Sequence, residues 1–395
     1  ELYAVIPSDG AADMDVTRET DATRVDENGL VEKLGANVPR IDYTGGGCPH
    51  ILAEPQRTNT LSYSEDFETS GWGVYNSTLE TDAVISPNGI LNATKLIGTN
   101  DVTAHTLYTT AYTVVASADY THSVFIKKSQ SKYVQLYTGS GFGNYYANFN
   151  LEDGIVETFT TLDANIENIG DGWYKCSTKA NSSTTTAQST VALIDSATSG
   201  RGYAFNAEDE SVYVWGAQVE EGSYATSYIP TSGSTVTRNQ DIFTRDGIGS
   251  LINSTEGVLF VEMAYLSETD PLLLRLSLSD GTTNNRIIIQ ANQNSNYIQF
   301  YLINSLGSQI SNYYILSNKT SFNKIAFKWK VNDFAVWSNG VEVITDTSGT
   351  TFSEGILNRL GFDGGNGSNN FFGKVKQLQV YKTALTDDTL ALLTS

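Results

Sequence analysis

The feature that most constrains the fold is a series of short runs in which apolar and polar residues alternate. The clearest run is KIAFKWKV at residues 324–331, where Ile325, Phe327 and Trp329 alternate with Lys and Ala. Alternation with a period of two places the apolar side chains on one face of a half-buried strand. Helical periodicity is confined to the C-terminus, where Thr386 is positioned to cap a short helix. The sequence therefore predicts an all-β protein with one short C-terminal helix.

Two Asn-Gly pairs predict tight turns between strands. Asn339-Gly340 lies between the apolar segments 335–337 and 341–343, and Asn28-Gly29 lies between residues 24–25 and 30–31. This dipeptide accepts the positive φ angles that a two-residue hairpin turn requires. We expect a β-hairpin at each place.

Length, composition and charge limit the domain count and the partners. A chain of 395 residues, 40% of them hydrophobic, suits two domains, each with its own core. The net charge of −20 repels phosphate backbones and anionic lipid, so we expect no nucleic-acid binding. No apolar run reaches the roughly 18 residues of a membrane span, so we expect no membrane insertion. The same charge can attract Ca²⁺ where carboxylates and amides converge.

The cysteines give little information about the fold. Cys48 and Cys176 are far apart, and no CxxC motif is present. This excludes zinc ribbons and thioredoxin-type chemistry. A Cys48–Cys176 disulfide remains open, beside the simpler interpretation of two buried thiols.

Strand signals and breakers divide the chain into three parts. Residues 1–58 hold few strand signals and several Pro and Gly breakers, and they are expected to form an extended N-terminal arm with one hairpin. Residues 59–236 contain about eight strand-like runs, as in a jelly roll. Residues 237–395 form a second all-β unit that ends with the short helix. The predicted fold is thus two β-sandwich domains behind an arm.

Several segments of the arm and of the middle part resemble one family. The arm segments are ATRV (22–25), VPRIDY (38–43) and EPQRTN (54–59). The middle segments are YSEDF (63–67), GWYKC (172–176) and WGAQVEEGSYATSYIPT (215–231). They resemble the arm and the carbohydrate-binding-module-like jelly roll of bacteriophage tail-fibre and other virion appendage proteins.

The C-terminal part resembles a concanavalin A-like or laminin G-like sandwich. The segments that carry this resemblance are EGVLF (256–260), WSNG (337–340), GKVKQ (373–377) and YKTALT (381–386). Together, the resemblances imply an extracellular protein on the virion surface that contacts other virion proteins. Fibres of this kind are commonly trimers, so self-association is expected, although no heptad repeat is present to enforce it.

The sequence offers no recognisable catalytic motif. Glycosidases on such sandwiches need paired carboxylates at alternate strand positions. The nearest candidate is Glu262, but Phe260 and Ala264 occupy the positions two residues away on either side. The chain has three histidines, none beside a partner in a patterned strand, and no GxSxG, HExxH or P-loop motif. We therefore expect a protein that is not an enzyme.

Alternation predicts outward faces that could bind a glycan. In residues 132–137, Val134 and Leu136 turn to the core. The outward residues of this strand and of the next are Tyr133, Gln135, Tyr137, Asn144, Tyr146 and Asn148. Residues 297–302 repeat the pattern, with Tyr297, Gln299 and Tyr301 outward. Aromatic rings and amides suit sugars, but β-propensity alone also places such residues on solvated sheet positions.

Two clusters of oxygen-bearing side chains are candidates for a structural Ca²⁺ ion, although no cofactor is required. Asp363 and Asn366 lie in the flexible segment 363–370, and Glu65, Asp66 and Glu68 lie near the start of the middle part. Ca²⁺ prefers six to eight oxygen ligands. The spacing does not match an EF-hand, and a plain turn at 363–370 remains the alternative.

The leading hypothesis is a non-catalytic phage appendage protein that binds host-surface or environmental polysaccharide. One alternative is a purely structural virion component, with the sandwiches as assembly modules. A depolymerase fragment is the third. Fold alone does not separate them.

Overall fold

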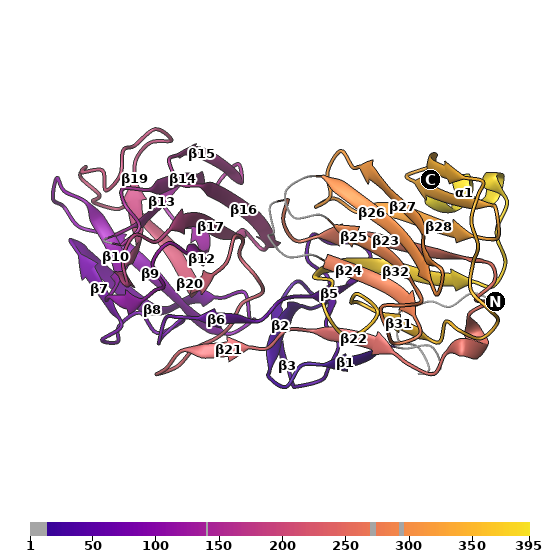
Figure 1. The fold of residues 1–395 in the computed structure, drawn as a ribbon. Coiled ribbons are helices and arrows are strands. Elements are labelled where there is room, and N and C mark those ends of the chain that lie inside the picture. Colours follow the sequence, from indigo (N-terminus) through magenta and orange to yellow (C-terminus); the bar gives the residue numbers. More distant parts are fainter. Residues whose placement is uncertain (1–13, 140, 269–273, 292–295) are drawn as a thin grey trace.

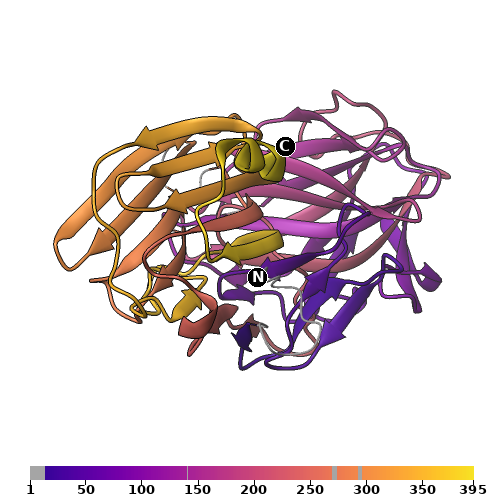
Figure 2. The ribbon, with the colours of Figure 1, turned by 90° about the vertical axis from the view of Figure 1, so that its right-hand side faces the viewer.

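The computed structural model describes residues 14–139, 141–268, 274–291 and 296–395, and it is all-β as the sequence predicts (Figure 1). Two β-sandwiches lie side by side, and Figure 2 shows them from the end at which the second sandwich faces the viewer. Beyond the strands, the described chain contains the 3₁₀ turn η1 (Gly249–Leu251) and the helix α1 (Asp387–Thr394). Within this described part, no helix has the length and apolarity needed to cross a bilayer.

The first sandwich packs two six-stranded sheets face to face. Sheet I has the order β15 (Ile155–Phe159), β14 (Tyr146–Asn150), β13 (Tyr133–Thr138), β19 (Ser189–Ile194), β10 (His105–Thr109), β7 (Trp72–Tyr75). Sheet II has the order β16 (Asp163–Gly170), β17 (Trp173–Asn181), β12 (Asp119–Lys128), β20 (Ser211–Glu221), β9 (Leu91–Gly98), β8 (Ser77–Ile85). Their inner faces share one core, which includes Leu136 and Phe149 from sheet I and Ile126 and Val214 from sheet II.

The second sandwich packs two seven-stranded sheets in the same way. Sheet III has the order β1 (Asp15–Thr17), β22 (Ile242–Arg245), β31 (Arg359–Gly361), β24 (Leu274–Ser279), β25 (Arg286–Ala291), β26 (Tyr297–Asn304), β27 (Gly307–Ile315). Sheet IV has the order β30 (Val341–Asp346), β29 (Phe334–Ser338), β28 (Asn323–Trp329), β23 (Gly257–Tyr265), β32 (Gly373–Tyr381), β5 (His50–Ala53), β4 (Ile41–Asp42). Phe300 and Phe327 meet edge to face in the core between them.

The first 58 residues contribute strands to the second sandwich. β1 pairs with β22 in sheet III, and β5 pairs with β32 in sheet IV. The remaining strands form three two-stranded pairs: β2 (Ala22–Val25) with β3 (Val31–Leu34), β6 (Arg57–Asn59) with β21 (Val236–Arg238), and β11 (Tyr112–Thr113) with β18 (Thr186–Ala187). The first sandwich therefore lies, in chain order, between two segments that build the second, and β6 and β21 pair where the chain enters and leaves it.

A buried ionic network lies where the two sandwiches join. Glu54 accepts from Arg40 Nη1 at 2.6 Å and from Arg238 Nη1 at 2.7 Å, and Asp241 pairs with both Arg40 and Arg18. All five side chains are at most 4% exposed. Burial would raise the pKa of Glu54, but the guanidinium groups of Arg238 and Arg40 hold it well below its usual range. Charged residues of the arm segments thus connect the arm to the rest of the second sandwich.

Local sequence signals are accurate for turns, helix cap and core. Asn339 and Gly340 have φ angles of 49° and 82° and join β29 to β30 as a two-residue turn. The second predicted hairpin also forms, but the longer segment 26–30 joins β2 to β3, and of Asn28 and Gly29 only Gly29 has a positive φ angle. The hydroxyl of Thr386 accepts from the Thr389 N–H at the start of α1. Trp329 is 0% exposed and lies in the core.

The two cysteines are both free thiols, of which Cys176 is buried and Cys48 is exposed. The expectation of two buried thiols is therefore wrong for Cys48.

The packing determines which sheet faces remain open. Helix α1 covers the outer face of sheet IV, where Leu390 packs on Phe260 and Trp337. The segment around Tyr228 covers the outer face of sheet II, where it meets Trp215. In Figure 1, β24 to β27 of sheet III have no further described strand or helix in front of them. At β24 to β27, the outer face of sheet III is therefore a surface on which a site can form, while the segment 195–202 covers part of the outer face of sheet I.

Candidate functional site

A row of polar side chains crosses the outer face of sheet III. The strand register places Arg275, Gln290 and Gln299 opposite one another on β24, β25 and β26. Arg275 Nε donates to Gln290 Oε1 at 2.5 Å, and Gln290 Nε2 donates to Gln299 Oε1 at 2.7 Å. Each side chain thus holds the next in one orientation. Among described residues, the Arg275 Nη atoms and Gln299 Nε2 have no hydrogen-bond partner, which leaves these donors available to a ligand.

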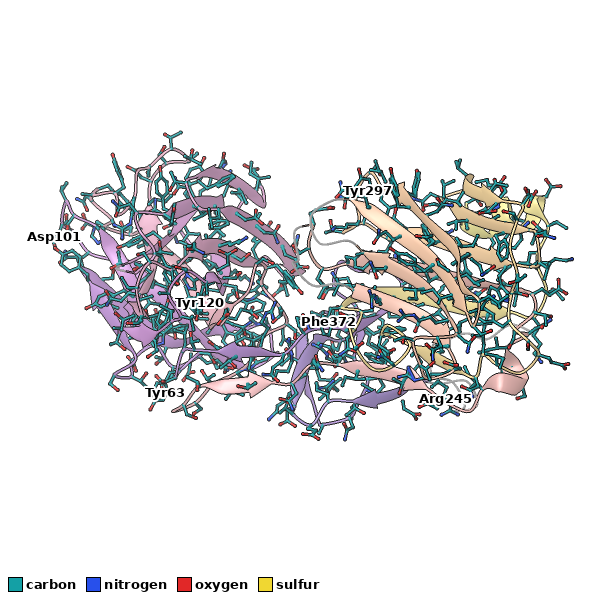
Figure 3. The ribbon with its side chains drawn as sticks, in the orientation of Figure 1. Tyr63, Asp101, Tyr120, Arg245, Tyr297 and Phe372 are labelled. Atoms are coloured by element: carbon teal, nitrogen blue, oxygen red, sulfur yellow. The ribbon has the colours of Figure 1, made fainter. Side chains whose placement is uncertain are left out.

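Three tyrosines flank this row. Tyr313 on β27 lies directly across from Gln299 and is 59% exposed. Its ring is 4.7 Å from that of Tyr297, at an angle of 69°, and Figure 3 labels Tyr297 on this sheet. Tyr301 follows Gln299 by two residues on β26, so it also lies on the outer face, and it is half-buried. Aromatic rings beside fixed amide and guanidinium donors are the combination that binds sugars, through ring stacking and directional hydrogen bonds.

The outward residues of sheet I include a buried amide pair. Gln135 and Asn148 lie opposite each other on β13 and β14, and both are 0% exposed. Gln135 Nε2 donates to Asn148 Oδ1 at 2.7 Å and to the Gly200 carbonyl at 3.0 Å. Gln135 Oε1 accepts from the Gly202 N–H, and Asn148 Nδ2 donates to the Ser199 carbonyl. The side-chain amides of Gln135 and Asn148 thus bind the segment 195–202 to the sheet. Because these amide atoms are already hydrogen-bonded within the protein, they are not free to bind a sugar.

The tyrosines of sheet I remain partly accessible. Tyr137 and Tyr146 face each other across β13 and β14, and both are half-buried. The guanidinium of Arg201 lies 4.4 Å from the Tyr137 ring centroid. Tyr133 is half-buried at the other end of β13, while Asn144 is exposed in the turn before β14. The structure therefore brings Tyr137 and Tyr146 together, but the predicted amides of Gln135 and Asn148 beside them are already bound to the protein.

The first predicted Ca²⁺ cluster is engaged in protein contacts. Asp363 is 0% exposed, pairs with Arg359 Nη2 at 2.7 Å and accepts from the Gly365 N–H at 2.6 Å. Asn366 accepts from the backbone and side chain of Ser368. The oxygens of Asp363 and Asn366 thus stabilise the turn.

The second predicted cluster does not converge. Burial raises the pKa of Glu65, whose carboxylate accepts from the Tyr228 hydroxyl at 3.0 Å. Asp66 and Glu68 are exposed, and Asp66 Oδ1 caps the Glu68 N–H. Over the described residues, no group of three or more His, Cys, Asp or Glu side chains is arranged to hold a metal ion.

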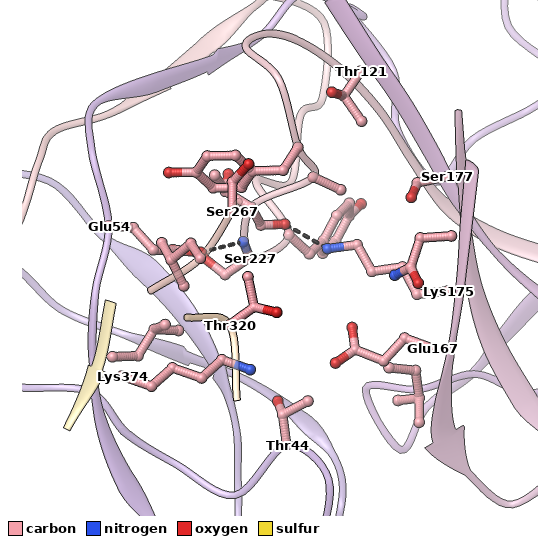
Figure 4. A pocket seen from close by; sticks show the side chains of 18 of the residues that line it. Thr44, Glu54, Thr121, Glu167, Lys175, Ser177, Ser227, Ser267, Thr320 and Lys374 are labelled. Carbon is pink, nitrogen blue, oxygen red and sulfur yellow. Dashed lines mark hydrogen bonds between the residues drawn. The ribbon is translucent and has the colours of Figure 1, made fainter. Parts of the chain in front are cut away.

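A cleft of about 610 Å³ separates the two sandwiches (Figure 4). Lys374 of β32 and Glu167 of β16 reach into it from opposite walls. Other charged groups in its walls are bound to the protein: Lys175 Nζ donates to the Thr226 carbonyl at 2.5 Å, and Glu54 belongs to the buried network. The Lys175 and Glu54 side chains are therefore already engaged in contacts within the protein.

Glu262 and the histidines lie in structural surroundings. Glu262 is 4.0 Å from Lys376 Nζ and lies opposite Lys324 and Gln377 on the neighbouring strands. His105 is buried and its ring nitrogens contact backbone carbonyls. Burial lowers the pKa of both His50 and His122 to about 4, in the case of His50 against the opposing effect of Asp42.

Sequence reasoning missed Arg275, Gln290 and Tyr313. Arg275 follows the core residue Leu274 and Gln290 lies between the core residues Ile289 and Ala291, whereas Tyr313 lies between the exposed Asn312 and the partly buried Tyr314. Alternation could have marked Arg275 and Gln290 as outward-facing, but the pattern around Tyr313 gives no such signal. Only the register of four strands, however, aligns Arg275 with Gln290, Gln299 and Tyr313.

Comparison with known proteins shows only distant similarity. No family model and no curated protein matches the chain. CBM40 of the Ruminococcus gnavus IT-sialidase, bound to α2,3-sialyllactose, is 19% identical with a TM-score of 0.32, over 37% of this chain and 86% of that one. Domains LG4-5 of mouse laminin α1 are 11% identical with a TM-score of 0.26, over 73% and 89%. The Trypanosoma rangeli sialidase complexed with sialic acid is 11% identical with a TM-score of 0.26, over 77% and 60%. At these values the function must be inferred from the site itself.

Proposed function

We propose that this chain is a non-catalytic carbohydrate-binding protein whose main glycan surface is the outer face of sheet III. One observation carries the proposal: Arg275, Gln290 and Gln299 form a hydrogen-bonded row whose remaining donors point to no described protein group. The exposed ring of Tyr313 provides a stacking surface beside these donors. Because the side chains are already ordered, a sugar would bind without the entropic cost of fixing them.

The ligand class follows from the shape of this surface. It is a sheet face rather than an enclosed pocket, so it suits several units of an extended chain rather than one small molecule. We propose a polysaccharide of a host surface or of the environment as the ligand. The resemblance of the arm and jelly-roll segments to virion appendage proteins supports an extracellular position on a virion.

Binding to a glycan array, followed by affinity electrophoresis in gels containing the polysaccharide identified, tests this proposal. Gln299→Ala combined with Tyr313→Ala should reduce affinity at least 10-fold, since it removes a hydrogen-bond donor and the stacking ring. The matched control is Tyr137→Ala with Tyr146→Ala on sheet I, which should retain affinity. Loss of binding in the control pair alone would place the site on sheet I instead.

A structural role as a rigid spacer is the second candidate. The buried network of Arg40, Glu54 and Arg238 supports it, because these charges are fixed at the junction rather than exposed to a ligand. Absence of binding on a broad glycan array would favour this role over carbohydrate binding.

A further inference from the structure

Within the described part of the chain, two arginines on the outer face of sheet III lack a carboxylate partner, although the full sequence has a net charge of −20. Arg275 on β24 and Arg286 on β25 have no Asp or Glu within ion-pair distance among the residues described. Their neighbour Arg359 differs, since it pairs with Asp246 at 3.0 Å and with Asp363 at 2.7 Å. In such an acidic chain, a neighbouring pair of unpaired cations is a feature that requires an explanation.

Both arginines are held in place by the segment 363–370 and by sheet III. Arg275 Nε is bound to Gln290, and Arg286 Nη1 donates to the Gly364 carbonyl at 2.5 Å. A Cβ atom on Gly364 would lie 3.2 Å from Arg275 Cδ, and one on Gly365 would lie 3.3 Å from Arg286 Cδ. The two glycines thus let this segment lie close against both arginine stems, which leaves the guanidinium groups ordered.

Buried donors without a partner lie between the two arginines. Ser277 lies on β24 between the positions of Arg275 and Ser279, and Ser279 is opposite Arg286. Ser277 is 0% exposed, and its Oγ has no hydrogen-bond partner in the described chain. Arg286 Nε is likewise buried and unpaired. Buried donors are nearly always satisfied in native proteins, so these atoms indicate a bound group that accepts hydrogen bonds.

We infer that Arg275, Arg286 and Ser277, with the segment 363–370, form an anion subsite for the acidic substituent of a polysaccharide on sheet III. The inference rests on the proposed function and narrows it to acidic glycans. Guanidinium groups bind planar or tetrahedral oxyanions through paired, charge-assisted hydrogen bonds. The substituent is a carboxylate or a sulfate, which share the oxygens and the negative charge that this site recognises.

The electrostatics of the site agree with an anion. Burial, together with repulsion from Arg275, lowers the pKa of Arg286. A bound anion would offset both effects. The same positive charges oppose a cation at the segment 363–370, where Asp363 is already neutralised by Arg359.

The test is affinity electrophoresis of the whole chain in three polymers: polygalacturonate, dextran sulfate and neutral dextran. We expect retardation by one or both acidic polymers, weakening as NaCl rises from 50 to 300 mM because salt screens charge pairs. Arg275→Gln with Arg286→Gln should lose at least 10-fold in affinity and most of the salt dependence. Lys33→Gln, which removes one positive charge from the arm hairpin as Arg275→Gln alone removes one from sheet III, should bind as the native chain does.

A second variant distinguishes loss of the anion subsite from loss of folding. Arg275→Gln alone removes a side chain whose one hydrogen bond to a described residue is to Gln290, so this variant should unfold at the native temperature and still lose affinity for the acidic polymer. Preference for polygalacturonate would identify the substituent as a carboxylate, and preference for dextran sulfate would identify a sulfate.

The outcomes separate this inference from the proposed function. Binding to dextran with no gain for either acidic polymer would overturn the anion subsite and leave carbohydrate binding intact. The anion subsite would also be overturned if the arginine variants bound the acidic polymers as tightly as the native chain does. No binding to any polymer here or on the glycan array would refute both.

Discussion

Replacing Glu54 by Gln removes the charge on which the junction between the sandwiches depends. The carboxylate accepts from Arg40 at 2.6 Å, from Arg238 at 2.7 Å and from the Ser227 N–H at 2.8 Å, and the residue is 3% exposed. Removing one partner of a buried ion pair typically costs about 3–5 kcal/mol. Since two guanidinium groups share Glu54, we expect a loss of ~5 kcal/mol, a large part of an ordinary folding free energy.

Urea denaturation followed by tryptophan fluorescence measures this loss. With a urea slope of about 3 kcal/mol per M, the unfolding midpoint of Glu54→Gln should fall by about 1.7 M. The control is Glu152→Gln, which breaks an exposed cluster with Lys128 and Lys132 and should leave the midpoint unchanged. A Glu54→Gln midpoint equal to that of the native chain would refute the role of the network.

Three further predictions concern the first sandwich. Burial lowers the pKa of the His122 side chain from 6.5 to about 4. Between these pH values the unfolded state binds more protons than the folded state, so the folding stability should fall by about 3 kcal/mol as the pH drops from 6.5 to 4. His122→Leu should flatten this slope in urea midpoints measured across that range, and an unchanged slope would contradict the assignment. In Gly98→Ala, the new Cβ would lie 2.4 Å from Ala207 Cβ, so we expect a destabilisation of about 1–3 kcal/mol, and a native melting temperature would count against the packing described. Gln135→Ala should speed proteolysis within residues 195–202 while glycan binding at sheet III persists, and equal cleavage rates would show that Gln135 does not hold this segment.

Local features of the fold were predictable because their causes are local. Alternation in residues 324–331 places Phe327 and Trp329 in the core, and Asn339-Gly340 forms the hairpin turn. The cap at Thr386 also depends only on residues within one helical turn. Period, turn geometry and capping all act over a few residues, so one sequence suffices to recognise them.

Features that depend on distant residues were not predictable. No local pattern indicates that β5 joins sheet IV beside β32, or that Glu54 pairs with Arg238. The same limit applies to the candidate sites. Alternation places Gln135 on the outer face of its strand, but a segment from elsewhere in the chain covers it. Likewise, alternation predicted that Gln299 faces outward. Its hydrogen-bonded row with Gln290 and Arg275, however, depends on how β24, β25 and β26 pair, which the local sequence does not show.

A crystal structure of the chain with an oligosaccharide of the polymer that it binds would show which surface holds the glycan. We expect sugar density on sheet III, with one ring against Tyr313 and hydroxyls within hydrogen-bond distance of Gln299 and Arg275. Sugar bound only at sheet I near Tyr137, or only in the cleft beside Lys374, would contradict this expectation.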